Sequence, residues 1–452
     1  MLQYIVSLIC LGLALAMFKI KIEYKIGILL IMFQLFSFVK IPVFGRATFL
    51  IPVCFLISEL RNYRKIIAYI KNTVISKAIA LFIISIILLI IFSPHLHDFN
   101  GIRNVFQEEV LFKYFLLLYS FYACRNLKQL RIITNFSLIG LAIMTLFGLL
   151  NYLTKDSYYV GALMSGYNAS SMFDGSMNFS SMFANSYRFR VNSTFLNPFD
   201  YGFMCIALFL FNTYALQQKI ISSKIYYLAL LSCIFGIATC GSRTVFLVGM
   251  IAGLVYVFFA FNLGKIVKLC LAMFFISIIA YSTIPAVSEK VDFALSAFDN
   301  NSDVGGSNID GRTTQYAAVF YHIQDCPFFG KGYMYFTIDL GWGRGKAYIV
   351  DNDLYGLEGV AMNYLLERGI VGYVFYLFFY ILLFVFLIRN RRKRKKEIAL
   401  GVSILTAYLV FANMTGELNS VQPTLLILGC SFGMLSSNNV KNKKLCYPNF
   451  QS

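Results

Sequence analysis

The chain has 452 residues, of which 59% are hydrophobic and only 13% are charged, and its formal net charge is +18. Its mean hydropathy of +0.70 excludes an ordinary soluble domain, so we predict an integral membrane protein. Apolar runs long enough to cross a hydrocarbon core of about 30 Å recur along almost the whole chain. The first run is one of many, and we therefore expect a retained helix rather than a cleaved signal peptide.

The predicted fold is an all-α polytopic membrane protein with about 12 or 13 transmembrane helices, because a helix satisfies its own backbone polar groups in lipid. The expected spans, in chain order, are 3–18, 26–39, 47–59, 78–93, 110–124, 132–153, 199–216, 225–240, 244–262, 269–285, 370–388, 398–413 and 421–437. The second and third runs are short, and Arg46 and Pro52 beside them leave a re-entrant hairpin as an alternative. Both choices give the same sidedness for every later segment.

The positions of Lys and Arg predict the orientation, because basic residues in short loops are retained in the cytoplasm. Of the 39 Lys and Arg, 25 fall in alternate turns and the C-terminal tail, and the acids there are Glu23 and Glu397. These stretches are 19–25, 60–77, 125–131, 218–224, 263–268, 389–397 and the tail after 438. The net positive charge therefore indicates topology, and the run from Arg389 to Lys396 is predicted to be a stop-transfer anchor rather than a nucleic-acid site.

The loops at 94–109, 154–198, 241–243 and 286–369 are thereby assigned to the opposite face, which in a bacterium is the periplasmic face of the inner (plasma) membrane. The expected division of the chain is into N-terminal helices (1–153), a first periplasmic loop (154–198), central helices (199–285), a large periplasmic loop (286–369) and C-terminal helices with a cytoplasmic tail (370–452). Nucleotide sugars and ATP are absent from that compartment, so chemistry there needs a substrate that arrives already activated.

No metal site, cofactor or disulfide framework is predicted. Cys326 is the only cysteine in an outward loop, which excludes an intramolecular disulfide there. The three histidines are His95, His97 and His322, and no Cys or His pair has ligand spacing on one outward element.

The large loop contains a predicted flap and a helix. Its segment Asp299–Asn308 is rich in Gly, Asn, Ser and Asp, as is typical of a mobile loop. Asp310 is expected to cap a helix that carries Arg312 in its first turn and an apolar stripe, which suits packing on the bundle or on the membrane surface. The stripe consists of Tyr316, Val319, Phe320 and Ile323.

Four motifs on the outward face carry a family resemblance. They are Arg190-Val-Asn-Ser-Thr-Phe-Leu-Asn-Pro198, Gly241-Ser-Arg243, Gly311-Arg312 with Pro327-Phe-Phe-Gly-Lys-Gly332, and Glu358 ahead of Asn363-Tyr-Leu-Leu-Glu-Arg-Gly-Ile-Val-Gly372. In this order they resemble the O-antigen polymerase and O-antigen ligase superfamily, and most of all a Wzy-type polymerase. The resemblance covers residues 188–388, and the N-terminal half agrees only in hydropathy.

The resemblance implies a glycosyltransferase-C-like, metal-independent membrane glycosyltransferase without a cofactor. Its donor would be a glycan on undecaprenyl diphosphate, which is moved onto the non-reducing end of an acceptor lipid-linked repeat unit in the bilayer. The product would be a lipopolysaccharide O-antigen or a capsule. A polysaccharide chain-length regulator is an expected partner, and nucleic acid is not.

The residue chemistry fits such a reaction, because a departing diphosphate needs cationic donors when no metal is present, and the planar fork of arginine matches phosphate oxygens. Arg243, at a short turn between two spans, is the first catalytic candidate, and its alternative role is a snorkelling residue at the interface. Arg312 is the second, and its alternative is a solvated arginine on the helix surface or a partner of Asp310.

The acceptor hydroxyl also needs a general base. Ligases of the superfamily usually have a histidine shortly ahead of the Glu-x-Gly that opens the next span, whereas the polar residue ahead of Glu367-Arg-Gly369 is Glu358. This difference favours the polymerase branch and makes Glu358 the predicted base, with two competing carboxylates nearby. The predicted substrate-binding residues are Arg188, Arg190, Asn197, Asp351, Asp353 and Tyr316.

Alternatives from other classes explain less of the sequence. A polysaccharide flippase or transporter typically shows paired repeats and charges at the bilayer midplane, but no repeat is found, and Glu59 and Lys113 fall near span ends. A structural or sensory protein leaves the outward arginines unexplained. Within the enzymes, an O-antigen ligase or a peptidoglycan polymerase of the cell-division type is the alternative.

Overall fold

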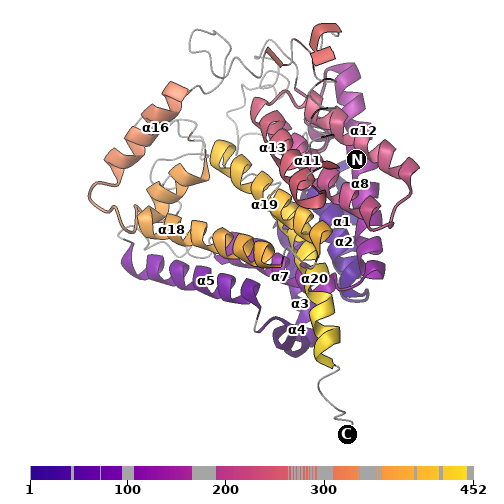
Figure 1. Cartoon of the computed structure of the whole chain (residues 1–452). Helices are drawn as coiled ribbons and strands as arrows, with labels where there is room; N and C mark the ends of the chain where they lie inside the picture. Colours follow the sequence, from indigo (N-terminus) through magenta and orange to yellow (C-terminus); the bar gives the residue numbers. More distant parts are fainter. Residues whose placement is uncertain are drawn as a thin grey trace.

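The computed structural model is a bundle of helices (Figure 1). It describes residues 2–41, 45–71, 73–93, 106–164, 190–262, 309–333, 359–390, 394–416 and 421–444, with single positions between 264 and 292 and at 335, 354 and 357.

The helices are α1 (Leu2–Ala16), α2 (Ile22–Leu35), α3 (Ala47–Glu59), α4 (Tyr63–Ile70), α5 (Val74–Phe92), α7 (Phe115–Ala123), α8 (Leu127–Thr154), α9 (Tyr158–Met164), α11 (Pro198–Gln217), α12 (Ser223–Thr239), α13 (Arg243–Ala260), α16 (Ile309–His322), α18 (Val360–Arg389), α19 (Lys395–Thr415) and α20 (Val421–Lys444). A 3-10 turn, η1 (Leu60–Asn62), joins α3 to α4, and a π-helix, η2 (Phe106–Tyr114), leads into α7. Two short antiparallel strands, β1 (Lys40–Ile41) and β2 (Gly45–Arg46), precede α3.

The all-α polytopic membrane class is confirmed. Among the described residues, six helices are long and apolar enough to cross a membrane: α5, α8, α11, α13, α18 and α19. The span expected at 269–285 falls largely outside the described residues. Helices α2 and α3 have 14 and 13 residues, or about 20 Å each. The re-entrant alternative for them stays a prediction.

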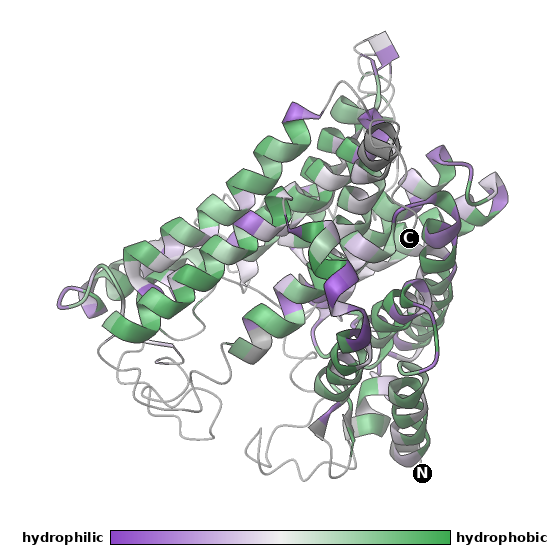
Figure 2. Cartoon of the chain, turned by 90° about the horizontal axis from the view of Figure 1, so that it is seen from below, coloured by the Kyte–Doolittle hydropathy of each residue, from purple (hydrophilic) through white to green (hydrophobic). Residues whose placement is uncertain are grey.

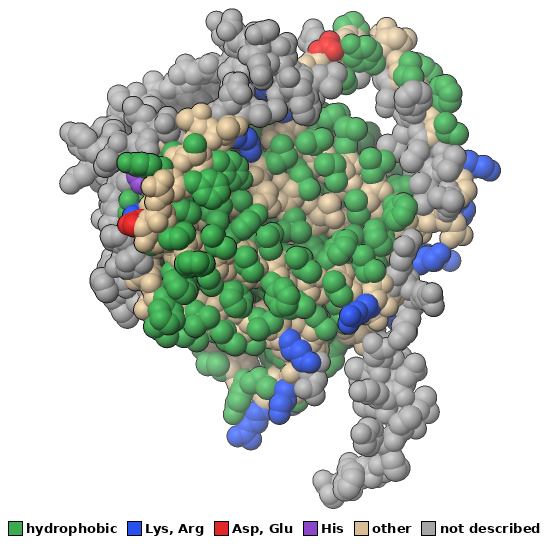
Figure 3. Space-filling model, turned by 60° about the vertical axis from the view of Figure 1, so that its left-hand side comes forward, with side chains coloured by type: hydrophobic (Ala, Val, Ile, Leu, Met, Phe, Trp, Pro, Cys, Tyr) green, Lys and Arg blue, Asp and Glu red, His purple; other side chains and the backbone are tan. Residues whose placement is uncertain are grey.

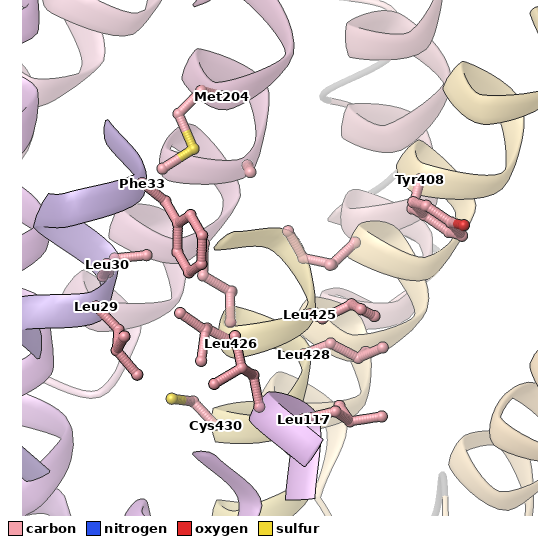
Figure 4. Close-up of a cluster of buried hydrophobic side chains, with 14 of the residues drawn as sticks. Leu29, Leu30, Phe33, Leu117, Met204, Tyr408, Leu425, Leu426, Leu428 and Cys430 are labelled. Atoms are coloured by element: carbon pink, nitrogen blue, oxygen red, sulfur yellow. The ribbon is translucent and has the colours of Figure 1, made fainter. Parts of the chain in front are cut away.

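Helix α11 is at the centre of the bundle, with 78% of its apolar window buried, and α19 follows with 67%. Figure 4 shows how Phe33 of α2, Leu117 of α7, Met204 of α11 and Leu426 of α20 come together in the core. Apolar attraction between helices is weak in lipid, so such packing depends on close van der Waals contact.

The outer surface of the bundle is apolar. Figure 2 shows hydrophobic residues along most helices and hydrophilic residues mainly near their ends, and Figure 3 shows a broad hydrophobic face with Lys and Arg at its lower margin. Helix α13 has only 22% of its apolar window buried, although it packs along α19. These exposed apolar surfaces are suited to contact with lipid.

The helices have two distinguishable ends. Lys395 Nζ donates to Asn262 Oδ1 at 2.9 Å and Lys396 Nζ donates to the Gln217 carbonyl at 2.6 Å, so α11, α13 and α19 meet where the Lys- and Arg-rich turns lie. We call this the basic end. The opposite end, where α11 and α13 begin and α19 finishes, is called the loop end.

Candidate functional site

The segment 190–197 is a polar loop buried at the loop end. Asn192, Ser193 and Thr194 are each 0% exposed. Ser193 Oγ donates to the Met144 carbonyl at 2.5 Å, and Thr194 Oγ1 donates to the Gln34 carbonyl at 2.7 Å. These bonds satisfy polar groups that lipid could not, so the loop ties α2 and α8 to the start of α11.

Asn197 ends this loop and caps α11. Its Oδ1 accepts from the Phe199 amide at 2.9 Å, and Pro198 occupies the first helical position, where its missing N–H costs nothing. The expected role of Asn197 in substrate binding stays a prediction beside this structural one.

Arg190 and Arg243 are neighbours. The Val191 amide donates to the Thr239 carbonyl at 3.1 Å, which holds the loop against the end of α12. A Cβ on Gly241 would lie 2.9 Å from Arg190 Cγ. Burial lowers the pKa of Arg190, and the nearby positive charge of Arg243 acts in the same direction. Two guanidinium groups therefore share one region where α11 and α13 begin.

Antiparallel packing brings Arg243 level with the last turn of α19. Asn262 and Lys395 are in contact at the basic end. Along the sequence, Asn262 is as far from Arg243 as Lys395 is from Met414. Each of these two stretches therefore covers about 28 Å from the basic end to the loop end. Arg243 and Met414 thus lie at similar height on adjacent helices.

Arg312 and the start of α18 reach the same helix end. Arg312 Nη2 donates to the Met414 carbonyl at 2.7 Å, one of the carbonyls without an intrahelical partner in the last turn of α19. A Cβ on Gly359 would lie 2.7 Å from the Asn413 carbonyl. We call Arg190, Arg243, Arg312 and the backbone of Gly359 the arginine site.

Of the remaining predicted site residues, only Tyr316 is among those that the structure describes. Arg188, Asp351, Asp353 and Glu358 lie outside the described residues. Tyr316 is half-buried and packs on a small apolar cluster between α16 and α18. That cluster includes Val319, Ile323, Met362 and Leu366.

The sequence motifs at 327–332 and 363–372 pair through backbone hydrogen bonds, and we call them the paired glycine segments. The Lys331 and Gly332 amides donate to the Leu366 and Glu367 carbonyls at 2.8 and 2.9 Å, and the Val371 amide donates to the Phe328 carbonyl at 3.0 Å. Gly369 has φ +61 and divides α18 into two helical segments.

Glycine is required on both sides of this contact. Gly330 has φ +67, and a Cβ on it would lie 2.5 Å from the Gly369 amide nitrogen. A Cβ on Gly369 would lie 2.5 Å from the Phe328 backbone. Pairing of the two segments therefore holds the turn after α16 against the kink of α18.

A buried ion pair that sequence reasoning missed lies beside the paired glycine segments. Arg368 donates to both carboxylate oxygens of Glu109, with Nη1 at 2.9 Å from Oε2, and Lys113 Nζ is 3.9 Å from Oε1. The Arg368 guanidinium lies 3.6 Å from the ring centroid of Tyr364 and 4.6 Å from that of Tyr333. The signal available in the sequence was Glu109 four residues before Lys113 at the start of an expected span.

Residues 228–377 match the family model for the O-antigen ligase. The match covers about a third of the chain and includes Arg243, Arg312 and the paired glycine segments, but not the loop at 190–197. It supports the O-antigen ligase and polymerase superfamily and a membrane enzyme of glycosyltransferase type. No curated protein matches the chain.

Proposed function

We propose that this protein polymerises lipid-linked polysaccharide repeat units at the periplasmic face of the bacterial inner membrane. The donor is a glycan on undecaprenyl diphosphate, and the acceptor is the non-reducing end of a second lipid-linked repeat. The observation that carries the proposal is that Arg190, Arg243 and Arg312 all lie at the loop end of the bundle, with Arg190 near Arg243 and Arg312 bound to the last turn of α19. Two of these three lie within the segment that matches the O-antigen ligase family.

The arginines suit a diphosphate leaving group. An acceptor hydroxyl oxygen attacks the anomeric carbon of the donor, the bond from that carbon to the diphosphate oxygen breaks, and the lipid diphosphate leaves with the electron pair. Arg243 and Arg312 would stabilise the new negative charge through forked hydrogen bonds. Arg190 and the positive N-termini of α11 and α13 add to the field at this end of the bundle.

Glu358 is proposed to accept the proton of the attacking hydroxyl. It directly precedes Gly359, whose backbone passes the end of α19 close to the carbonyl that Arg312 binds. Asp351 and Asp353 are the competing bases. Arg188, Asn197 and Tyr316 are proposed to contact phosphate or sugar.

The paired glycine segments and the Arg368–Glu109 ion pair would hold the residues of this site in position. Both hold the kink of α18 against the bundle, one through backbone hydrogen bonds and the other through a link to η2. A general base and arginines on different elements need such support, since a displacement of about 1 Å can lower a rate about 100-fold.

An O-antigen ligase is the second candidate, because the matching family carries that description. A ligase would use the same leaving group but move finished polymer onto a lipid A core. The two functions differ in their acceptor, so the molecule to which the polymer becomes attached distinguishes them.

The glycan profile of a deletion strain tests the choice. The strain is complemented with the wild type, Arg243→Ala, Arg312→Ala or Glu358→Gln, with Arg64→Ala, an exposed position at the basic end, as the control. A polymerase predicts that the ladder collapses to single repeats with the three site variants and persists with the control. Long polymer retained on the lipid carrier would instead establish a ligase, and an unaltered ladder would contradict both.

A further inference from the structure

Helix α16 has one side packed on the protein and another side exposed. Val319 is 0% exposed and Ile323 is 2% exposed, and both contact the helical segment that precedes the kink of α18. Tyr321 lies on the opposite side and is 69% exposed, and Phe320, between the two sides, is 53% exposed. Nearer the start of the helix, the same exposed side carries Thr313 and Thr314 instead. The exposed surface of α16 is therefore polar where the helix begins and aromatic where it ends.

Phe328 continues the aromatic surface to the edge of α18. It is 62% exposed, and its carbonyl accepts from the Val371 amide, at the first turn of the membrane-spanning part of α18. That part runs from 370 to Arg389, which is about 30 Å, the thickness of a hydrocarbon core. Its exposed apolar residues are Ile370, Val374, Phe378, Ile381, Val385 and Ile388. Phe328 thus lies at the end of this exposed apolar stripe, whose length matches the thickness of a hydrocarbon core.

The neighbouring helix α5 ends at the same level. Phe92 is 56% exposed and stacks on Phe329 with the ring centroids 5.0 Å apart. The side of the molecule that carries α5, α16 and α18 presents a continuous hydrophobic surface in Figure 3. Aromatic side chains are enriched at this depth in membrane proteins because their rings suit the boundary between hydrocarbon and water.

We propose that Phe320, Tyr321 and Phe328 form an aromatic anchor that inserts into the interface of the leaflet at the loop end. The occupant of this exposed surface is lipid, because the surface is continuous with the lipid-facing stripe of α18. Arg312 lies eight residues before Phe320, or at most about 12 Å along α16. The anchor therefore keeps Arg312 close to the headgroup region, where, if the proposed function holds, the diphosphate of a lipid carrier lies.

Fluorescence quenching of single tryptophans tests the anchor without any activity measurement. Trp342, the only tryptophan of the chain, is first replaced by Phe. Tyr321→Trp and Phe328→Trp are then compared with Thr314→Trp, an exposed position in the second turn of α16. The variants are placed in nanodiscs that contain lipids brominated near the headgroup or deep in the chain.

The anchor predicts that shallow bromine quenches the Tyr321→Trp and Phe328→Trp variants at least about twofold more strongly than the Thr314→Trp variant, and that aqueous acrylamide shows the reverse order. The use of two anchor positions guards against one variant that fails to fold. Equal acrylamide quenching at all three positions, with no effect of brominated lipid, would overturn the proposal.

Discussion

Arg368 of α18 and Glu109 of η2 form a buried ion pair that joins the kink of α18 to the N-terminal half of the bundle. Both side chains are only 8% exposed. Removing one partner would leave the other charge buried without an opposite charge beside it. Replacing both with apolar residues would leave no buried charge.

We therefore expect Glu109→Gln and Arg368→Met each to destabilise the protein by about 3–5 kcal/mol. The double variant should lose less than the sum of the two single losses, with an interaction energy above about 0.5 kcal/mol. Unfolding of the detergent-solubilised protein measures both quantities. Strictly additive losses would show that the two side chains are not coupled.

The paired glycines predict a second stability effect. Gly369→Ala and Gly330→Ala would place a Cβ 2.5 Å from backbone atoms at positive φ, so each should cost about 1–3 kcal/mol or more. Gly253→Ala in α13 is the matched control, because no heavy atom lies within 4 Å of its added Cβ. There helix propensity favours Ala by about 1 kcal/mol. Equal thermal stabilities for all three variants would contradict the described pairing.

The arginine site predicts an effect on the chemical step. Arg243→Ala should lower the release of lipid diphosphate by about 100- to 1000-fold, the usual loss when one donor to a developing charge is removed. Arg243→Lys should recover part of the rate, since the charge is kept and the planar fork is lost. Arg64→Ala, an exposed position at the basic end, is the control. A fully active Arg243→Ala variant would remove this residue from the mechanism.

The orientation predicted from Lys and Arg can be tested with added cysteines. Thr314→Cys at the start of α16 and Lys128→Cys at the basic end are both exposed. A membrane-impermeant maleimide should label the first variant in intact cells with a permeable outer membrane, and the second only after the inner membrane is opened. Labelling is read against the parent protein, and the opposite pattern would invert the assignment of faces.

Hydropathy was sufficient for several of the helices because span length and apolarity are local properties. The run expected at 47–59 is α3, Ala47–Glu59, with Pro52 inside it, and the run expected at 225–240 is α12. The helix in the large loop was also predictable from its apolar stripe, but the capping role expected for Asp310 was wrong. The helix begins at Ile309, so Asp310 lies inside its first turn rather than at the N-cap position.

Contacts between distant segments could not be predicted in this way. Arg368 and Glu109 are 259 positions apart, and Thr194 and Gln34 are 160 positions apart. Composition gives no indication that Gly330 and Gly369 face each other or that Arg312 caps α19. The sequence identified Arg190, Arg243 and Arg312 by their charge and side, and their relation to one helix end depends on the antiparallel packing of α13 and α19.

The most direct test of the central claim is elongation by the purified protein in nanodiscs supplied with one synthetic undecaprenyl-diphosphate-linked repeat unit. The proposed function predicts a ladder of lipid-linked oligomers, with one undecaprenyl diphosphate released for each new linkage, and its loss in the Arg243→Ala and Arg312→Ala variants. If the repeat unit stays unpolymerised while a lipid A core accepts preformed polymer from the same carrier, the protein is a ligase and the polymerase claim is wrong.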